Sequence, residues 1–231
     1  MRRISILFAI LALGLLASQA LAQEAAAPQF KDQREKVSYI TGINVGNMIK
    51  NQDTDLDANM VMRGIQDGLN GIKPKLSAEE IQQAVQAYEA EHAKKLQSMA
   101  ETNVQEGQAF LDKNKKNPDV VTLPSGLQYK ILKRGDGPSP TAADKVTVRY
   151  KGTYINGKVF DSTADGGDPV SFRVDQVIPA WQEALPMMKV GDKWELYVPS
   201  ALAYGAQGFP PIGPNATLIF QIELLGVNQT P

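Results

Sequence analysis

The sequence predicts an α+β protein with an all-helical N-terminal part and a C-terminal antiparallel sheet wrapped on one short helix. Three observations lead to this prediction. Apolar residues recur at helical spacing from Gln29 to about Asn114, strand-like alternation begins near Thr122, and Asn156-Gly157 is a strong β-hairpin signal. Because helices and strands are segregated along the chain, two domains are favoured over one interwoven unit.

The first residues have the features of a secretory signal peptide. Two arginines precede an apolar run over Ile4–Leu16, and Ala20-x-Ala22 is a small-residue cleavage pattern. The run is short for a membrane span, so the sequence predicts a removable signal over residues 1–22 rather than an uncleaved anchor. No later stretch is apolar enough to cross a bilayer, so no membrane span is expected after cleavage.

Two amphipathic helices are expected after the signal. The first covers about Gln33–Asn51 and contains Gly42-x-x-x-Gly46, a spacing that lowers helix propensity but lets another helix backbone approach closely. The second covers about Asp57–Asn70, begins at an aspartate cap and stops at Gly71. Each helix taken alone is an ordinary amphipathic helix.

A long third helix is expected over Ser77–Asn114, because Ser77-x-x-Glu80 forms a capping box and no proline follows before Pro118. At 1.5 Å per residue its length is on the order of 55 Å. So small a helical part cannot bury it, and we expect it to project as a stalk or to pack against another chain. The simplest partner is a second copy, so residues 23–114 are predicted to be a dimerisation domain.

Residues 115–121 form a predicted linker, in which Pro118 ends the helix and lysines lie at its negative dipole end. Residues 122–231 form the predicted sheet domain. Its short helix is expected over Ile178–Leu185. Alternating apolar residues predict strands over Leu127–Lys133, Lys145–Tyr154, Trp194–Val198 and Thr217–Leu225, and the hairpin signal adds Lys158–Phe160.

Composition removes most chemistry that needs a thiol, a metal or a histidine. The chain has no cysteine and one histidine, His92, which lies among charged residues on a predicted helix face. Disulfides, thiolate nucleophiles, cysteine zinc sites and iron–sulfur clusters are excluded, and a catalytic triad would depend on His92 alone. The formal charge of −1 provides no basic field for nucleic acid. We therefore expect no cofactor, no metal and no nucleic-acid partner.

The C-terminal part instead contains aromatic and branched residues that interrupt polar loops. They are Tyr150, Phe160, Phe172, Val177, Ile178, Trp181, Tyr204, Phe209, Ile212 and Phe220. This pattern is typical both of a buried core and of a concave site for an apolar ligand, and it leaves the two interpretations open. Asp161 and the other aspartates of this part lie next to turn residues, where capping is their ordinary role.

Three segments of the C-terminal part match a known family in order and spacing. They are Val146-Thr-Val-Arg-Tyr-Lys-Gly-Thr with Phe160-Asp161, then Gln176-Val-Ile-Pro-Ala-Trp181, then Ala203-Tyr-Gly-Ala with Ile212-Gly-Pro-Asn-Ala-Thr-Leu-Ile-Phe220. Over about Thr122–Val227 the chain resembles the FKBP-type peptidyl-prolyl cis-trans isomerases. The helical half resembles the N-terminal dimerisation domain of the Mip-like and FkpA-like periplasmic members.

The resemblance implies an FKBP-like half-barrel sheet and rotation of X–Pro bonds, with the substrate proline on the Trp181 indole. It implies that the Ile178 backbone N–H and the Tyr204 hydroxyl contact substrate carbonyls, and that Asp161 faces the twisting amide. The residues it assigns to catalysis are Tyr150, Phe160, Asp161, Ile178, Trp181, Tyr204 and Phe220. Those it assigns to substrate binding are Phe172, Val177, Phe209 and Ile212.

This reaction also explains why no acid, base or metal is evident. Amide resonance sets a barrier of about 18–20 kcal/mol to X–Pro rotation. The twisted transition state loses that resonance and is less polar, so a dry aromatic site stabilises it relative to the planar ground state. A nearly flat pH profile around neutrality is expected.

The resemblance implies three kinds of partner: proline-containing unfolded or partly folded proteins, a second copy of the chain, and macrolide inhibitors. It places the protein in the periplasm, with outer-membrane or cell-surface association as an alternative. Ala180, Val170 and Phe209 replace residues common in other members, which leaves sequence preference and inhibitor affinity open. Two non-enzymatic alternatives are a dimeric holdase chaperone that grips unfolded chains between its stalks, and a secreted or surface interaction factor.

Overall fold

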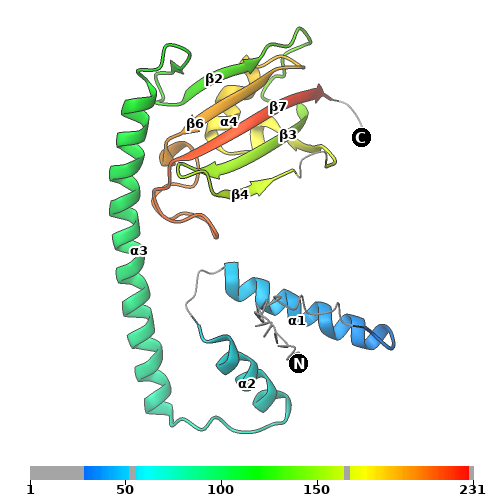
Figure 1. Cartoon of the computed structure of the whole chain (residues 1–231), viewed down its shortest axis with the longest axis vertical. Helices are drawn as coiled ribbons and strands as arrows, with labels where there is room; N and C mark the ends of the chain where they lie inside the picture. Colours follow the sequence, from blue (N-terminus) through cyan, green and yellow to red (C-terminus); the bar gives the residue numbers. More distant parts are fainter. Residues whose placement is uncertain (1–28, 52–55, 164–166, 229–231) are drawn as a thin grey trace, which may run out of the picture. The chain divides into compact units, whose positions relative to one another are not determined.

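The computed structural model describes residues 29–51, 56–163 and 167–228, so the predicted signal over residues 1–22 lies outside the described part. The helical part contains α1 (Gln33–Asn51), α2 (Ala58–Leu69) and α3 (Ala78–Asn114), as Figure 1 shows. All three predicted helices are confirmed. Within the described ranges, no helix combines the length and apolar character that crossing a membrane requires.

Local side-chain bonds fix where two of these helices begin. The Asp57 carboxylate accepts hydrogen bonds from the backbone N–H groups that follow it at the start of α2. At α3 the Glu80 N–H donates to the Ser77 hydroxyl at 3.2 Å, and the Ser77 N–H donates to the Glu80 carboxylate at 2.8 Å. The predicted capping box is therefore present, and α3 runs on for 37 residues.

Apolar side chains on the helical part are exposed. The exposed residues are Val37, Tyr39, Ile40, Ile43 and Met48 on α1, Met60, Met62, Ile65 and Leu69 on α2, and Ile81 and Val85 on α3. In α2, whose residues are all described, none is buried. An amphipathic helix gains most of its stability by burying its apolar face, and the apolar face of α2 is exposed in the single chain.

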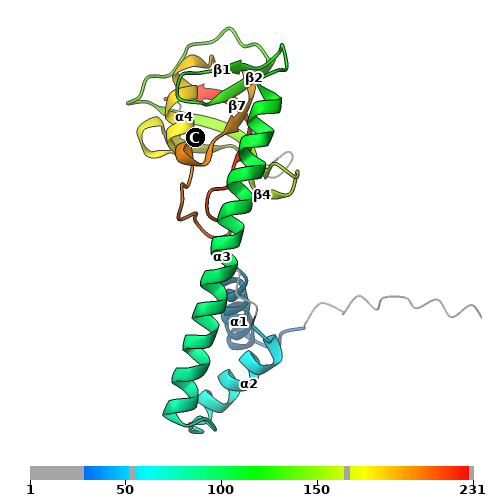
Figure 2. The ribbon, with the colours of Figure 1, turned by 90° about the vertical axis from the view of Figure 1, so that its left-hand side faces the viewer.

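The C-terminal part is an antiparallel sheet with strand order β1-β2-β6-β7-β3-β4, in which crossovers bring β6 beside β2 and β7 beside β3, and β5 also pairs with β3. Its strands are β1 (Val121–Thr122), β2 (Gln128–Lys133), β3 (Lys145–Tyr154), β4 (Val159–Ser162), β5 (Val170–Arg173), β6 (Lys193–Val198) and β7 (Leu218–Val227). The short helix α4 (Pro179–Ala184) lies against one face of this sheet, as Figures 1 and 2 show. The predicted fold class is confirmed.

The core of this part lies between α4 and the inner face of the sheet. Buried and half-buried residues alternate strictly along β7, where Leu218, Phe220, Ile222 and Leu224 face inward as predicted. The inward residues of β3, β6 and α4 join them in one buried cluster. The hairpin between β3 and β4 also forms at the predicted turn, where Gly157 has a φ of +84° and its N–H donates to the Tyr154 carbonyl at 2.9 Å.

The surroundings of α3 differ from the expectation of a free stalk or a helix that only another chain covers. The chain divides into two compact units, Met1–Val45 and Gly46–Pro231, and α3 belongs with the sheet in the second. Its C-terminal half packs on the sheet part of the same chain, where the Phe110 and Tyr197 rings lie 5.9 Å apart and Gly107 is buried. The sequence did not predict these contacts, because they join residues as far apart in the chain as Phe110 and Tyr197, which helical spacing does not reveal.

Candidate active site

Three aromatic rings stand nearly perpendicular to the Trp181 indole. The ring centroid of Tyr150 lies 5.3 Å from that of Trp181 at an interplanar angle of 82°. Phe220 lies at 5.6 Å and 85°, and Phe172 at 6.0 Å and 83°. Edge-to-face contacts of this kind are the favoured geometry for aromatic pairs. The indole therefore has three aromatic walls, and 4% of its surface stays accessible.

The sheet register explains why these rings meet. Strand β3 pairs with both β5 and β7, so Tyr150 of β3, Phe172 of β5 and Phe220 of β7 come from neighbouring strands. The chain places Trp181 on α4, which covers the same face. Residues distant in sequence are thereby collected around one indole.

Phe160 of β4 extends this ring cluster. It lies 5.6 Å from Phe220 at 86°, and a glycine makes room for it. A Cβ on Gly152 would lie 2.6 Å from the end of the Phe160 ring. On its other side Phe160 contacts the ring of Tyr154 at 5.4 Å, a residue that the sequence did not single out for the site. Tyr154 shares the face of Tyr150 and Gly152 on β3, so strand periodicity was the available signal.

Asp161 lies beside the rings and accepts a hydrogen bond from the Tyr150 hydroxyl. Burial raises the pKa of Tyr150 far above its ordinary value of 10, and the hydrogen bond to Asp161 and its charge add to the effect. Burial also raises the pKa of Tyr204, with a further contribution from the Asp161 charge. Both phenol groups consequently stay protonated, as hydrogen-bond donors, throughout the neutral range.

The segment before α4 presents a free backbone donor. Ile178 caps the helix in an extended conformation, and its carbonyl accepts the Trp181 N–H at 2.9 Å. Among the described residues, no acceptor is bonded to the Ile178 N–H. The preceding Val177 carbonyl is already bonded to the Gln182 side chain at 2.7 Å. The Ile178 N–H is thus available to a ligand carbonyl.

The loop that follows Tyr204 contributes two further candidate residues. Ile212 is buried in the core cluster, whereas Phe209 is 62% exposed and stacks on Tyr204 at 5.9 Å and 22°. Phe209 and Ile212 exchange backbone hydrogen bonds of 2.8 and 2.6 Å, and the Tyr154 hydroxyl donates to the Pro211 carbonyl. Phe209 therefore joins the other site residues through its ring contact with Tyr204 and its backbone hydrogen bonds with Ile212.

No cluster of three or more histidine, aspartate or glutamate side chains suited to a metal occurs in the described ranges. The groups present are aromatic rings, one carboxylate, two phenol donors and one backbone N–H. They can bind an apolar ring and hydrogen-bond the carbonyls beside it.

An aromatic site of this kind, on an antiparallel sheet that wraps a short helix, is compatible with a prolyl isomerase. The family described as "FKBP-type peptidyl-prolyl cis-trans isomerase" matches residues 137–225, and "Domain amino terminal to FKBP-type peptidyl-prolyl isomerase" matches residues 34–131. The chain belongs to the FKBP-type peptidyl-prolyl isomerase family.

Its relatives place it with the Mip and FkpA members. It is 43% identical to "Outer membrane protein MIP" of Legionella longbeachae over 222 residues, which cover 94% of this chain and 95% of the relative. It is 38% identical to the isomerase FkpA of Escherichia coli over an alignment of 248 residues, which covers 99% of this chain and 92% of FkpA. The crystal structure of Escherichia coli FkpA matches with a TM-score of 0.61, covering 88% of this chain and all of that one. These relatives favour an isomerase over the holdase alternative.

Proposed function

We propose that this isomerase accelerates X–Pro rotation in exported proteins that are still folding, and that the proline binds on the Trp181 indole. The observation that supports the site is the set of three rings perpendicular to that indole. A proline ring is compact and apolar, so an indole floor with aromatic walls complements it in size and polarity.

The geometry suggests how the barrier is lowered without acid–base chemistry. Resonance in the X–Pro amide sets a barrier of about 18–20 kcal/mol, and the twisted amide that lacks this resonance is less polar than the planar one. Surroundings made of Tyr150, Phe160, Phe172 and Phe220 favour the less polar form. The Ile178 N–H and the Tyr204 hydroxyl would hold the flanking carbonyls, so binding energy fixes the chain while the amide turns.

The direct test is a peptide isomerisation assay on the wild-type protein, read by the fluorescence or NMR signal of a short X–Pro peptide. We expect catalysis, and we expect the same kcat/KM before and after a chelator has removed any metal from the protein. If no X–Pro peptide were isomerised, whichever residue precedes the proline, the result would contradict the proposal.

Activity is expected to stay constant within about two-fold from pH 6 to pH 9. The pKa values of Tyr150 and Tyr204 are both raised above 10, so neither hydroxyl loses its proton in this range. For a phenol with a raised pKa, the stabilising contribution is complete below pH 10 and is lost as the pH rises through the folded-state pKa. kcat/KM and the melting temperature should therefore fall together above pH 10. A bell-shaped profile centred near pH 7 would indicate an acid–base mechanism instead.

We also propose that the chain is a homodimer through residues 23–114, with residues 115–121 as the linker and residues 122–231 as the isomerase domain. The exposed apolar faces of α1 and α2 support this proposal. On α2, Met62, Ile65 and Leu69 lie on one face of the helix, with the polar Asn59, Arg63 and Gln66 beside them, and a helix of a second copy would cover these apolar side chains.

Changing Ile65 to aspartate is expected to convert the dimer into a monomer. A carboxylate buried in an apolar interface costs several kcal/mol, and about 4 kcal/mol would raise the dissociation constant about 1000-fold. Light scattering measures the mass directly. The matched control is Leu132→Asp on β2, an exposed leucine of the sheet part, which should leave the mass unchanged. A monomeric wild-type protein at micromolar concentration would contradict the dimer.

The proposed location is the periplasm, with export directed by residues 1–22. Cell fractionation followed by N-terminal sequencing of the mature protein tests this proposal, and the expected first residue is Gln23. Recovery in the membrane fraction would favour outer-membrane association. Macrolides that occupy the same ring-lined site are proposed as inhibitors, and competition with the X–Pro peptide would show their binding.

A further inference from the structure

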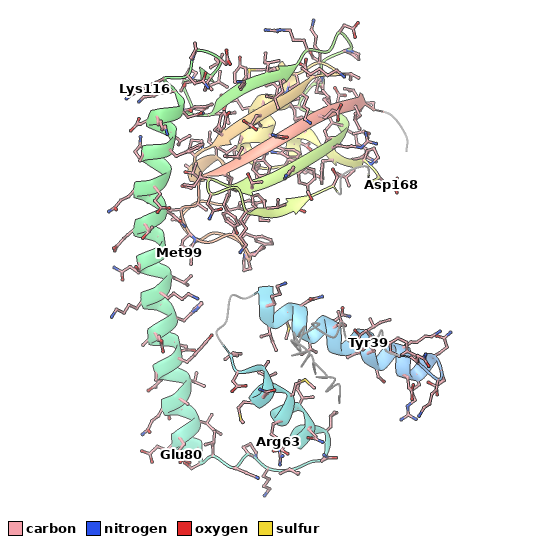
Figure 3. All side chains as sticks on the ribbon, in the orientation of Figure 1. Tyr39, Arg63, Glu80, Met99, Lys116 and Asp168 are labelled. Atoms are coloured by element: carbon pink, nitrogen blue, oxygen red, sulfur yellow. The ribbon has the colours of Figure 1, made fainter. Side chains whose placement is uncertain are left out.

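One stripe of α3 lies against the sheet part, while most of the residues between its members are exposed. Its members recur every three or four positions and are Met99, Asn103, Gly107, Phe110, Leu111 and Asn114. Figure 3 labels Met99 at the level where α3 meets the loop before β7. The stripe therefore uses one face of the helix over its last four turns.

Three successive turns of α3 contact the loop that leads into β7, over Gly205–Thr217. The Asn103 amide donates a 2.7 Å hydrogen bond to the Pro214 carbonyl. Two glycines allow close approach on either side of it. A Cβ on Gly213 would lie 2.5 Å from the Met99 sulfur, and a Cβ on Gly107 would lie 2.3 Å from the Thr217 hydroxyl. The helix and the last part of the loop, Gly213–Thr217, are thus in direct contact.

The end of the stripe is fixed to the sheet itself. The Gln128 amide, which is 3% exposed, donates to the Leu111 carbonyl at 3.0 Å and accepts from the Asn114 amide at 2.9 Å. The Phe110 ring lies against Tyr197 of β6. A buried glutamine that is satisfied from both sides holds the helix end in one position. The rest of the stripe can therefore act as a rigid support.

The same loop carries part of the candidate active site. It starts directly after Tyr204, contains Phe209 and Ile212, and leads into the strand that carries Phe220. Pro214, which accepts the Asn103 bond, is two residues from Ile212. On the other side, the Asn215 N–H closes the loop on the Gly205 carbonyl at 2.9 Å. A movement of Pro214 would therefore also displace Ile212.

We infer that Asn103 is a positioning residue for the isomerase site: α3 holds the Gly205–Thr217 loop in its binding conformation and so sets substrate affinity. The inference rests on the proposed function of the ring-lined site. A loop that is already ordered loses less conformational freedom when the substrate binds. Without the Asn103 bond, the loop would lose its conformational entropy when the substrate binds. This loss weakens substrate affinity more than it slows rotation of the bound amide.

The test is Asn103→Asp in the full-length protein. A carboxylate has nearly the shape of the amide but cannot donate to the Pro214 carbonyl, and it repels that oxygen. At pH 7.5 we expect KM for an X–Pro peptide to rise three- to ten-fold, with kcat changed less than two-fold. Lowering the pH to 4 protonates about half of a carboxyl with the ordinary aspartate pKa near 3.9, and the protonated form can donate again, so KM should return part of the way toward the wild-type value measured at the same pH.

Few ionisable side chains near position 103 could interfere with this recovery of KM at low pH. The Gly205–Thr217 loop contains no ionisable side chain, and Glu106, one turn further along α3, is exposed. The matched control is Gln105→Glu, which makes the same change of amide to carboxylate on the exposed face of α3. It should keep the wild-type KM at both pH values.

A second variant approaches the same contact from the other side. Gly107→Ala adds the Cβ that meets Thr217, and it should also raise KM three-fold or more with kcat retained. If Asn103→Asp does not fold, as judged by thermal melting, Asn103→Ala takes its place with the same expected rise in KM. An active wild type with unchanged KM in the Asn103 and Gly107 variants overturns the inference, as does a rise in the KM of Asn103→Asp that is identical at both pH values. An inactive wild type overturns the proposed function instead.

Discussion

Replacing Asp161 by alanine is expected to lower kcat/KM by about ten-fold or more. The Asp161 carboxylate accepts the Tyr150 hydroxyl at the edge of the ring cluster, and a hydrogen bond to a charged group contributes about 1.5–3 kcal/mol. If that energy stabilises the transition state, its loss corresponds to about ten-fold or more in rate. Because Asp161 is exposed, the free energy of unfolding should change little. The peptide isomerisation assay and a denaturant titration measure the two quantities separately.

Two further variants separate the charge of Asp161 from its role as an acceptor. Asp161→Asn keeps an acceptor for the Tyr150 hydroxyl but removes the charge, so its kcat/KM should lie between those of the wild type and the alanine variant. Asp175→Ala removes an exposed aspartate that is paired with Arg173, and it should leave kcat/KM unchanged. Full activity in Asp161→Ala would remove Asp161 from the proposed site.

Short-range signals made much of the fold predictable. The capping box at Ser77 and the hairpin glycine Gly157 act through bonds to residues three or four positions away, so both could be read from the sequence. The inward face of β7 could also be read, because its period of two is fixed by the strand itself. These features need no knowledge of how distant segments pack.

The position of α3 could not be predicted in the same way. Asn103 and Gly107 look like ordinary residues of a polar helix, and their significance comes from Pro214 and Thr217, more than a hundred residues away. The stripe is held by the amides of Asn103, Asn114 and Gln128, two glycines and one ring pair rather than by a broad apolar face. A pattern based on hydrophobic period alone does not detect such a surface.

The candidate site was predicted from a family resemblance, and the residues alone left two interpretations open. Aromatic residues at these positions serve equally well as core. Trp181 shows why: it belongs to the buried cluster and yet is ringed by three perpendicular aromatic walls. Burial and function coincide at this residue, so only the arrangement of the rings around it separates a binding floor from plain packing. A comparison between the chain's two tryptophans tests that distinction.

Trp181→Phe is expected to lower kcat/KM at least five-fold, whereas Trp194→Phe should leave it within two-fold of the wild type. The two indoles are equally buried at 4% exposure, and within the described residues neither ring nitrogen has a hydrogen-bond partner. Each substitution removes a similar volume and should cost about 1–2 kcal/mol of stability. Trp194 stacks on Tyr129 at 4.4 Å, outside the ring cluster, so its loss should affect stability alone. Thermal melting and the isomerisation assay on both variants make the comparison.

The same pair of variants reports binding directly, because the chain has two tryptophans in all. In Trp194→Phe the only indole left is Trp181, and a bound proline ring would displace water from it and shift its fluorescence emission. In Trp181→Phe the remaining indole stacks on Tyr129 and should not respond to the peptide. A concentration-dependent shift in the first variant with none in the second would locate the proline at Trp181. The opposite result, with turnover intact in Trp181→Phe, would make this indole a core residue and move the binding site elsewhere.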